Sequence, residues 1–149
     1  MGSIRRITVH HEGSTPVTFT DPAATIRRLE GIRRYHFRER GWGDIGYHYV
    51  VDRSGYIWAA RDLSYQGAHV KNHNECNLGI MVLGNFDEQR PSVEQFNTLQ
   101  RAVATFMRGY DVPLQRVYTH RELTPGHTEC PGRYLQQYMV KIRRDGWLG

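Results

Sequence analysis

The chain has 149 residues, of which 39% are hydrophobic and 23% are charged. This size and composition are typical of one folded domain with its own core, and they exclude a disordered chain. The formal charge of +5 is a modest basic excess that favours a polyanionic partner without choosing among nucleic acid, anionic lipid and an anionic cell wall. No groove-reading motif accompanies it, and no apolar run approaches the roughly 18 residues that cross a bilayer. We therefore expect a single, monomeric domain over residues 1–149, with no nucleic-acid partner and no membrane insertion.

The N-terminus and the cysteine content indicate in which cellular compartment the protein is made. Residues 1–11 contain no apolar segment of the kind found in a signal peptide. We therefore expect synthesis in the cytoplasm, with any substrate outside it reached after release or through another delivery system. Cys76 and Cys130 are too few for a disulfide scaffold, and we expect Cys76 to be a half-buried free thiol.

Helix signals and apolar periodicity predict strands that alternate with helices. Asp21-Pro22 is a typical helix start, Ser92 and Gln95 form a capping box, and Gly109 is expected to be the C-cap of the second helix. In the first helix, Ile26, Leu29 and Ile32 predict one apolar stripe. The expected strands are 4–11, 47–51, 56–59, 78–83 and 116–119, and the expected helices are 23–39, 92–109 and 133–144.

These elements predict an α/β fold with one central mixed sheet and helices on both of its faces. The continuous apolar run 78–83 is typical of a central strand that is covered on both sides. The polar stretch 64–77 is expected to be a long loop, and long loops without structure of their own are often binding loops.

Three potential metal ligands stand out. His10 and His120 each lie at or just past the end of a predicted strand, and Cys130 follows His120 across a loop. In open α/β sheets the connecting loops leave a crevice at that edge, where ligands bind. Two imidazoles and one thiolate are the ligand set of a zinc ion with an open fourth position, which is the arrangement of a catalytic zinc. If the three converge, the chain is a metallohydrolase.

Four segments, in this order, resemble one family across almost the whole chain. They read ITVHHEGS, GWGDIGYHYVVDRSG, GAHVKNHNECNLGIMVLGNFD and YTHRELTPGHTECPG. The family is that of the zinc-dependent N-acetylmuramoyl-L-alanine amidases, which includes phage lysozyme-type endolysins and animal peptidoglycan-recognition proteins. The resemblance implies one Zn²⁺ per chain, held by His10, His120 and Cys130. Periodicity alone does not decide between His10 and His11. By the resemblance, His11 is expected to pack or to form a hydrogen bond behind the site.

The resemblance also implies roles for three further residues. Tyr47 falls on the family's active-site tyrosine, whose phenol would donate a hydrogen bond to the scissile carbonyl or the developing oxyanion. Thr128 stands where many members carry a lysine, so it can orient water but cannot supply a positive charge. His69 falls on a cleft histidine and is expected to contact substrate, while His73 is expected to face solvent. The ten residues from His120 to Cys130 exceed the spacing of the phage-lysozyme type, so the subfamily stays open.

The implied function is a zinc amidohydrolase that cleaves the amide bond between the lactyl group of N-acetylmuramic acid and the L-alanine of the stem peptide. Its partner would be peptidoglycan or muropeptides, and its role lytic, as in an endolysin or autolysin. Two alternatives stay open. One is a binding module, because some recognition proteins of the family have lost a metal ligand and only bind peptidoglycan. The other is a regulator that binds a protein partner. The presence of Cys130 favours the enzyme.

Overall fold

A computed structural model describes residues 1–146 of the chain, which fold around one five-stranded sheet. The strand order is β3-β2-β4-β1-β5. The strands are β1 (Arg6–His11), β2 (Tyr49–Val51), β3 (Ile57–Ala59), β4 (Asn77–Val82) and β5 (Val117–Thr119). The helices are α1 (Pro22–Arg38), α2 (Val93–Tyr110), α3 (His120–Leu123) and α4 (Arg133–Asp145), with a 3-10 turn at Leu114–Arg116 before β5.

The sheet is mixed, as predicted. β2, β4, β1 and β5 are parallel to their neighbours, and only β3 is antiparallel, where it forms a hairpin with β2. β4 occupies the centre, and every one of its residues is buried. A strand that is covered on both faces needs apolar residues at consecutive positions, which explains the run from Leu78 to Val82.

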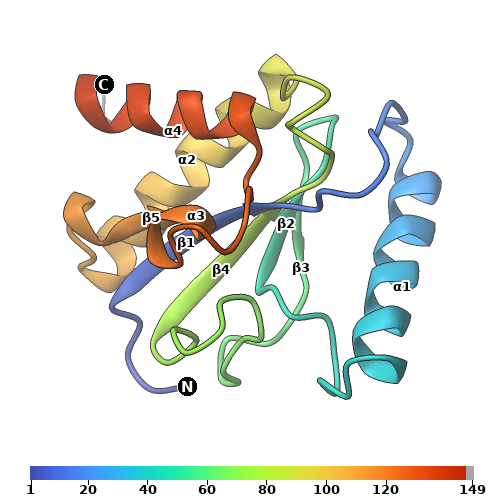
Figure 1. Ribbon diagram of the computed structural model, residues 1–149, viewed down its shortest axis with the longest axis horizontal. Helices are drawn as coiled ribbons and strands as arrows, with labels where there is room; N and C mark the ends of the chain where they lie inside the picture. The colour runs from blue at the N-terminus through green and yellow to red at the C-terminus, as the bar shows by residue number, and fades with distance from the viewer. Residues whose placement is uncertain (147–149) are drawn as a thin grey trace.

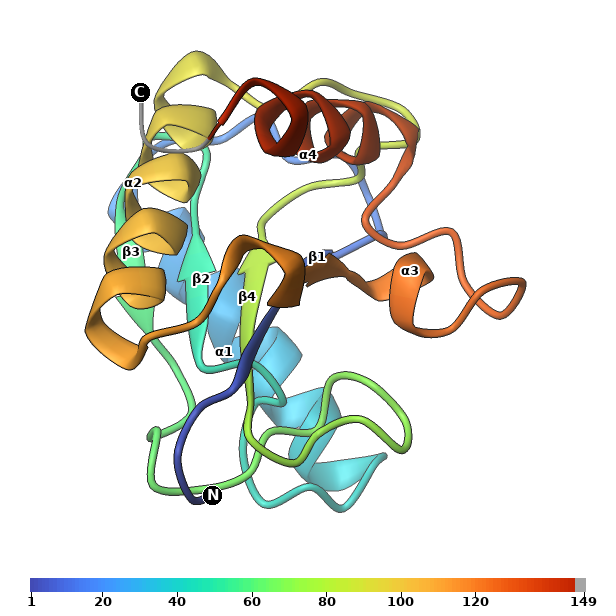
Figure 2. The ribbon, with the colours of Figure 1, turned by 90° about the vertical axis from the view of Figure 1, so that its left-hand side faces the viewer.

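Helices cover both faces of the sheet, which confirms the predicted α/β architecture. Figure 1 shows α1 on one side of the strands and α2 with α4 on the other, and Figure 2 shows α1 behind the sheet. Leu29 and Ile32 of α1 pack against a buried cluster that contains Met81 of β4. The opposite face packs against α2 and α4 through Leu99 and Leu135. The predicted stripe of α1 is therefore only partly buried, because Ile26 stays 47% exposed.

The helix starts match the sequence signals, whereas one helix end does not. The Asp21 side chain caps α1, and Ser92 and Gln95 form the predicted capping box at the start of α2. The prediction that α2 ends at Gly109 is wrong, since the helix continues to Tyr110 and its C-cap is Asp111 in the left-handed conformation, with φ 54° and ψ 47°. Asp tolerates that conformation better than most residues do. None of the described helices is long and apolar enough to span a bilayer.

Candidate metal centre

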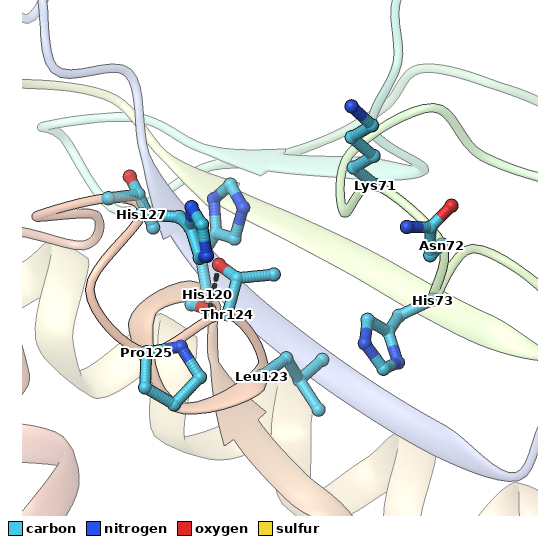
Figure 3. Close-up of a pocket in the computed structure, with 9 residues that line it drawn as sticks. Lys71, Asn72, His73, His120, Leu123, Thr124, Pro125 and His127 are labelled. Atoms are coloured by element: carbon cyan, nitrogen blue, oxygen red, sulfur yellow. Dashed lines mark hydrogen bonds between the residues drawn. The ribbon is translucent and has the colours of Figure 1, made fainter.

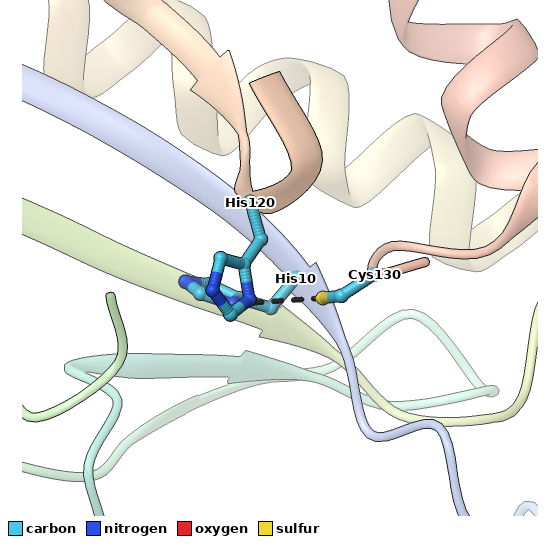
Figure 4. Close-up of side chains that lie close together, drawn as sticks. All are labelled: His10, His120 and Cys130. Atoms are coloured by element: carbon cyan, nitrogen blue, oxygen red, sulfur yellow. Dashed lines mark hydrogen bonds between the residues drawn. The ribbon is translucent and has the colours of Figure 1, made fainter. Parts of the chain in front are cut away.

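The sheet brings the three predicted metal ligands together. His10 is the penultimate residue of β1, and β5 lies beside β1 with Val9 opposite Thr119, so His120 follows directly alongside His10. Cys130 comes from the loop that precedes α4. The ligand atoms of His10, His120 and Cys130 all lie within 4.8 Å of one another, and Figure 4 shows their side chains converging from three segments.

The spacing of His10 and Cys130 fits a tetrahedral zinc ion. His10 Nδ1 lies 3.6 Å from Cys130 Sγ. Bond lengths of about 2.05 Å for Zn–N and about 2.3 Å for Zn–S, at a tetrahedral angle, place the two donors about 3.6 Å apart. The backbone N–H of His11 donates to the sulfur at 3.4 Å, which favours a thiolate there. Burial raises the pKa of the metal-free Cys130 thiol to about 12, so metal binding would release its proton.

The alternation of side chains along β1 separates the two adjacent histidines. His10 pairs in register with Met81, which faces the α1 side of the sheet, so His10 points to that side. His11 points to the other side, where its Nδ1 accepts a hydrogen bond of 3.1 Å from the backbone N–H of Phe86. Its place behind the site is the one expected of a supporting residue.

His69 lies behind His10 and fixes which of its ring nitrogens faces the metal position. His69 Nε2 is 3.1 Å from the carbonyl oxygen of Asn77, which only accepts, so that nitrogen carries the proton. His69 Nδ1 therefore accepts from His10 Nε2–H over 2.8 Å, and the lone pair of His10 Nδ1 is left facing Cys130. Burial lowers the pKa of His69 to about 3, in keeping with a neutral ring. The sequence assigned His69 to substrate contact, but the side chain is only 7% exposed.

Tyr47 lies beside both His10 and His69. Its ring centroid is 5.1 Å from that of His10 and 6.4 Å from that of His69. Burial raises the pKa of Tyr47 well above its ordinary value, and the neighbouring Cys130 and Glu12 add to the rise. The phenol thus keeps its proton and can act as a hydrogen-bond donor. Glu12, which no sequence motif singles out, is held by Arg28 at 2.8 Å.

A cleft of about 670 Å³ opens beside His120. Figure 3 shows its two walls, one formed by Lys71, Asn72 and His73 and the other by the segment from His120 to Thr128. Thr128 lines this cleft, and its Oγ1 accepts from the backbone N–H of Cys130 at 3.2 Å. His73, which was expected to face solvent, lines the cleft instead. Lys71, Asn72 and His127 were not singled out, because nothing in their periodicity shows which way a loop residue faces.

Comparison with known proteins relates the chain to one family. A family model described as N-acetylmuramoyl-L-alanine amidase matches residues 1–133. The human protein named N-acetylmuramoyl-L-alanine amidase is 31% identical over 129 residues, which are 85% of this chain and 22% of that protein. The chain thus spans about a fifth of the length of this relative.

Solved structures with the same fold include both lytic and recognition proteins. The amidase LysC from Clostridium intestinale superposes with a TM-score of 0.76 at 25% identity, covering 94% of this chain and 85% of that one. Drosophila PGRP-LB, solved as a Tyr-to-Phe mutant in complex with tracheal cytotoxin, gives a TM-score of 0.78 at 25% identity over 94% of this chain and 79% of that one.

Proposed function

The chain belongs to the N-acetylmuramoyl-L-alanine amidase family, and from this premise we propose that it is a zinc hydrolase of peptidoglycan. Its substrate is the amide bond that joins the lactyl group of N-acetylmuramic acid to the L-alanine of the stem peptide, and its role is lytic. The observation that carries the proposal is the convergence of His10, His120 and Cys130 within 4.8 Å. Three protein ligands leave a fourth position open, as in catalytic zinc sites.

The side chains around the candidate metal centre have different roles in the proposed reaction. A zinc ion bound by these three ligands would supply a Lewis acid and a water of lowered pKa. Tyr47, protonated and half-buried beside His10, donates a hydrogen bond to the oxygen of the scissile carbonyl as negative charge develops on it. The cleft between residues 71–73 and the His120–Thr128 segment holds the muropeptide against the centre.

The leaving amine is protonated on the side of the cleft that Thr128 lines. Both ring nitrogens of His69 are already engaged, by His10 and by Asn77. Glu129 has a side chain that is 84% exposed and lies 3.7 Å from Arg121. Thr128 Oγ1 accepts from Cys130 N–H, which leaves its own hydroxyl proton free to donate into the cleft. We therefore assign Thr128 to orienting the water through which the amine is protonated.

Mass spectrometry of purified muropeptides after incubation tests the proposal. The expected products are a muramic acid with a free lactyl carboxylate and a stem peptide with a free N-terminal L-alanine. A chelator abolishes their formation, and added zinc restores it. Cys130→Ala, with zinc content measured in parallel, should lose metal and activity together. Binding of muropeptides with no cleavage would instead assign the chain to the recognition proteins, and cleavage of a glycosidic bond would overturn the assigned reaction.

A further inference from the structure

The positive charge of this protein is concentrated in one helix. Residues 22–40, which comprise α1 and its C-terminal extension, contain six arginines and two glutamates. The remaining 130 residues contain 14 basic and 13 acidic residues, so they are almost neutral. The net charge of +5 is therefore a local property of the α1 region and not an average over the surface.

Three arginines of α1 form an exposed stripe, which we call the arginine stripe: Arg27, Arg34 and Arg38. Residues at i, i+7 and i+11 lie on one face of a helix. This face points away from Leu29 and Ile32, which pack on the sheet. All three side chains are exposed, and within residues 1–146 none of them has an ion pair or a side-chain hydrogen bond.

Their neighbours on the same helix are, in contrast, already neutralised. Arg28 pairs with Glu12 at 2.8 Å, and Arg33 pairs with Asp44 at 2.9 Å. The unpaired guanidinium groups therefore form a line that extends about 16 Å along the helix. Guanidinium groups bind phosphate oxygens in a bidentate manner, which makes arginine the preferred residue for phosphate recognition.

The arginine stripe is continuous with the candidate metal centre. Arg27 and Tyr47 both line one hollow of about 450 Å³, together with Glu12 and its partner Arg28. The Tyr47 ring lies 5.1 Å from that of His10. A second hollow, of about 290 Å³, is lined by Arg34 and Arg38 and also by Glu30 and Arg33. The stripe therefore begins close to the residues of the candidate metal centre.

We propose that the arginine stripe of α1 binds an anionic phosphodiester polymer of the cell wall and holds the protein on its substrate. The proposal rests on the proposed function only in placing the protein at the wall. A lipid surface fits less well, because a helix that lies in a membrane inserts its apolar face. Leu29 and Ile32 of α1 are packed on the sheet, and only Ile26, Tyr35 and Phe37 remain as exposed large apolar side chains of this helix. A line of charges also suits a linear polyanion better than a single small anion.

Sedimentation with purified walls, in the presence of a chelator so that no wall is digested, tests the proposal. The triple variant Arg27→Gln, Arg34→Gln, Arg38→Gln should bind walls that carry phosphodiester polymers roughly 10- to 100-fold more weakly than the wild type, with a shallower dependence on salt. A matched control, Arg101→Gln, Arg108→Gln, Arg116→Gln, removes the same charge from three other exposed positions and should bind like the wild type. On walls stripped of these polymers by acid, all three proteins should bind alike.

Three results would overturn the proposal. They are equal binding of the two triple variants to intact walls, an undiminished difference between them on stripped walls, and tighter wild-type binding to anionic lipid vesicles than to intact walls. Hydrolysis of a small soluble muropeptide should be unchanged in the stripe variant. The muropeptide assay also separates the proposed hydrolase function from the proposed wall binding. A wild type that fails to cleave the soluble muropeptide contradicts the hydrolase function, whereas the sedimentation assay decides the wall binding.

Discussion

Tyr47 combines two properties that suit a hydrogen-bond donor at the metal centre. Its ring lies 5.1 Å from that of a predicted metal ligand, His10, and desolvation raises the pKa of this half-buried residue well above the ordinary value. A hydroxyl that keeps its proton stays a hydrogen-bond donor, and a donor already in position needs little reorganisation when charge develops on a substrate oxygen.

Tyr47→Phe removes that donor and almost nothing else. We expect zinc content and the unfolding midpoint to stay close to those of the wild type, while kcat falls by about 10²-fold, the usual cost of losing one oxyanion donor. Steady-state kinetics on a soluble muropeptide, with zinc measured on the same samples, provides the check. A kcat equal to that of the wild type would reduce Tyr47 to a residue of the scaffold.

His69 provides a second test at this scale, because the sequence and the structure give it different roles. If it orients His10, His69→Leu should weaken zinc binding by about 10- to 100-fold, as is typical when the partner of a metal-bound histidine is lost. His69→Gln, whose amide oxygen can still accept from His10 Nε2–H, should recover part of that affinity. Competition with a colorimetric chelator measures both.

The substrate-contact role predicted from the sequence has a different signature. In that case KM for the muropeptide should rise while zinc affinity stays unchanged in both variants. The sequence had no means to decide between the two roles, because the path of the loop over residues 64–77 carries no periodicity. Only the fold shows that the His69 side chain is buried and donates a hydrogen bond from Nε2 to the carbonyl oxygen of Asn77.

At the scale of elements, the end of α2 contains two residues, Gly109 and Asp111, that could each terminate the helix. Gly109 is the residue most often found just beyond a helix, yet it lies inside α2 with no atom within 4 Å of an added Cβ. The left-handed position belongs to Asp111, at φ 54°. Its backbone N–H bonds to the carbonyl of Met107, and that bond closes the last turn.

Two substitutions distinguish the predicted helix end from the observed one. Gly109→Ala should raise the free energy of unfolding by about 0.5–1 kcal/mol, because alanine is the better residue inside a helix. Asp111→Gly should also stabilise, by several tenths of a kcal/mol, since glycine adopts the left-handed conformation without strain. Urea unfolding measures both. Destabilisation by Gly109→Ala would mean that the helix ends where the sequence first suggested.

Other elements followed from the sequence because their signals are local. Asp21 and Ser92 start helices through hydrogen bonds to backbone N–H groups three residues away, and such bonds depend on nothing outside the segment. The four-residue helix α3, which begins at His120 itself, was not predicted. A helix this short is too brief for periodicity to show, and its position depends on β5 lying beside β1.

At the scale of the whole molecule, the order of the strands assembles the centre. β1 lies between β4 and β5, although these segments are far apart in the chain, and this order places His120 beside His10. Alternating helices and strands predict an α/β sheet, but they do not specify the order of its strands. The resemblance to a known family therefore contributed what the residue pattern alone left open, namely which of His10 and His11 belongs to the ligand set.

Because several histidines are neutral in the folded protein, its stability is expected to fall in acid. His36 allows this effect to be measured apart from the metal centre. Its Nδ1 accepts a hydrogen bond of 2.9 Å from the backbone N–H of Gly46, and this bond links α1 to the segment that leads to Tyr47. Burial, with smaller effects from Arg40 and Arg61, lowers the pKa of His36 to about 4. In the unfolded chain the value is about 6.5. Between these values the unfolded state binds the proton and the folded state does not.

Stability should therefore be complete above about pH 6.5 and should fall as the pH drops toward about 4. Burial also lowers the pKa values of His10, His11, His48 and His69. The stability of the wild type should therefore depend on pH more steeply than the uptake of a single proton would give. His36→Asn keeps an acceptor for Gly46 but cannot titrate, and it should lose less stability than the wild type between about pH 7 and about pH 5. Urea titrations of the metal-free proteins across this range measure both slopes. Parallel slopes would show that the proton on His36 is not linked to folding and that the acid sensitivity arises at the other histidines.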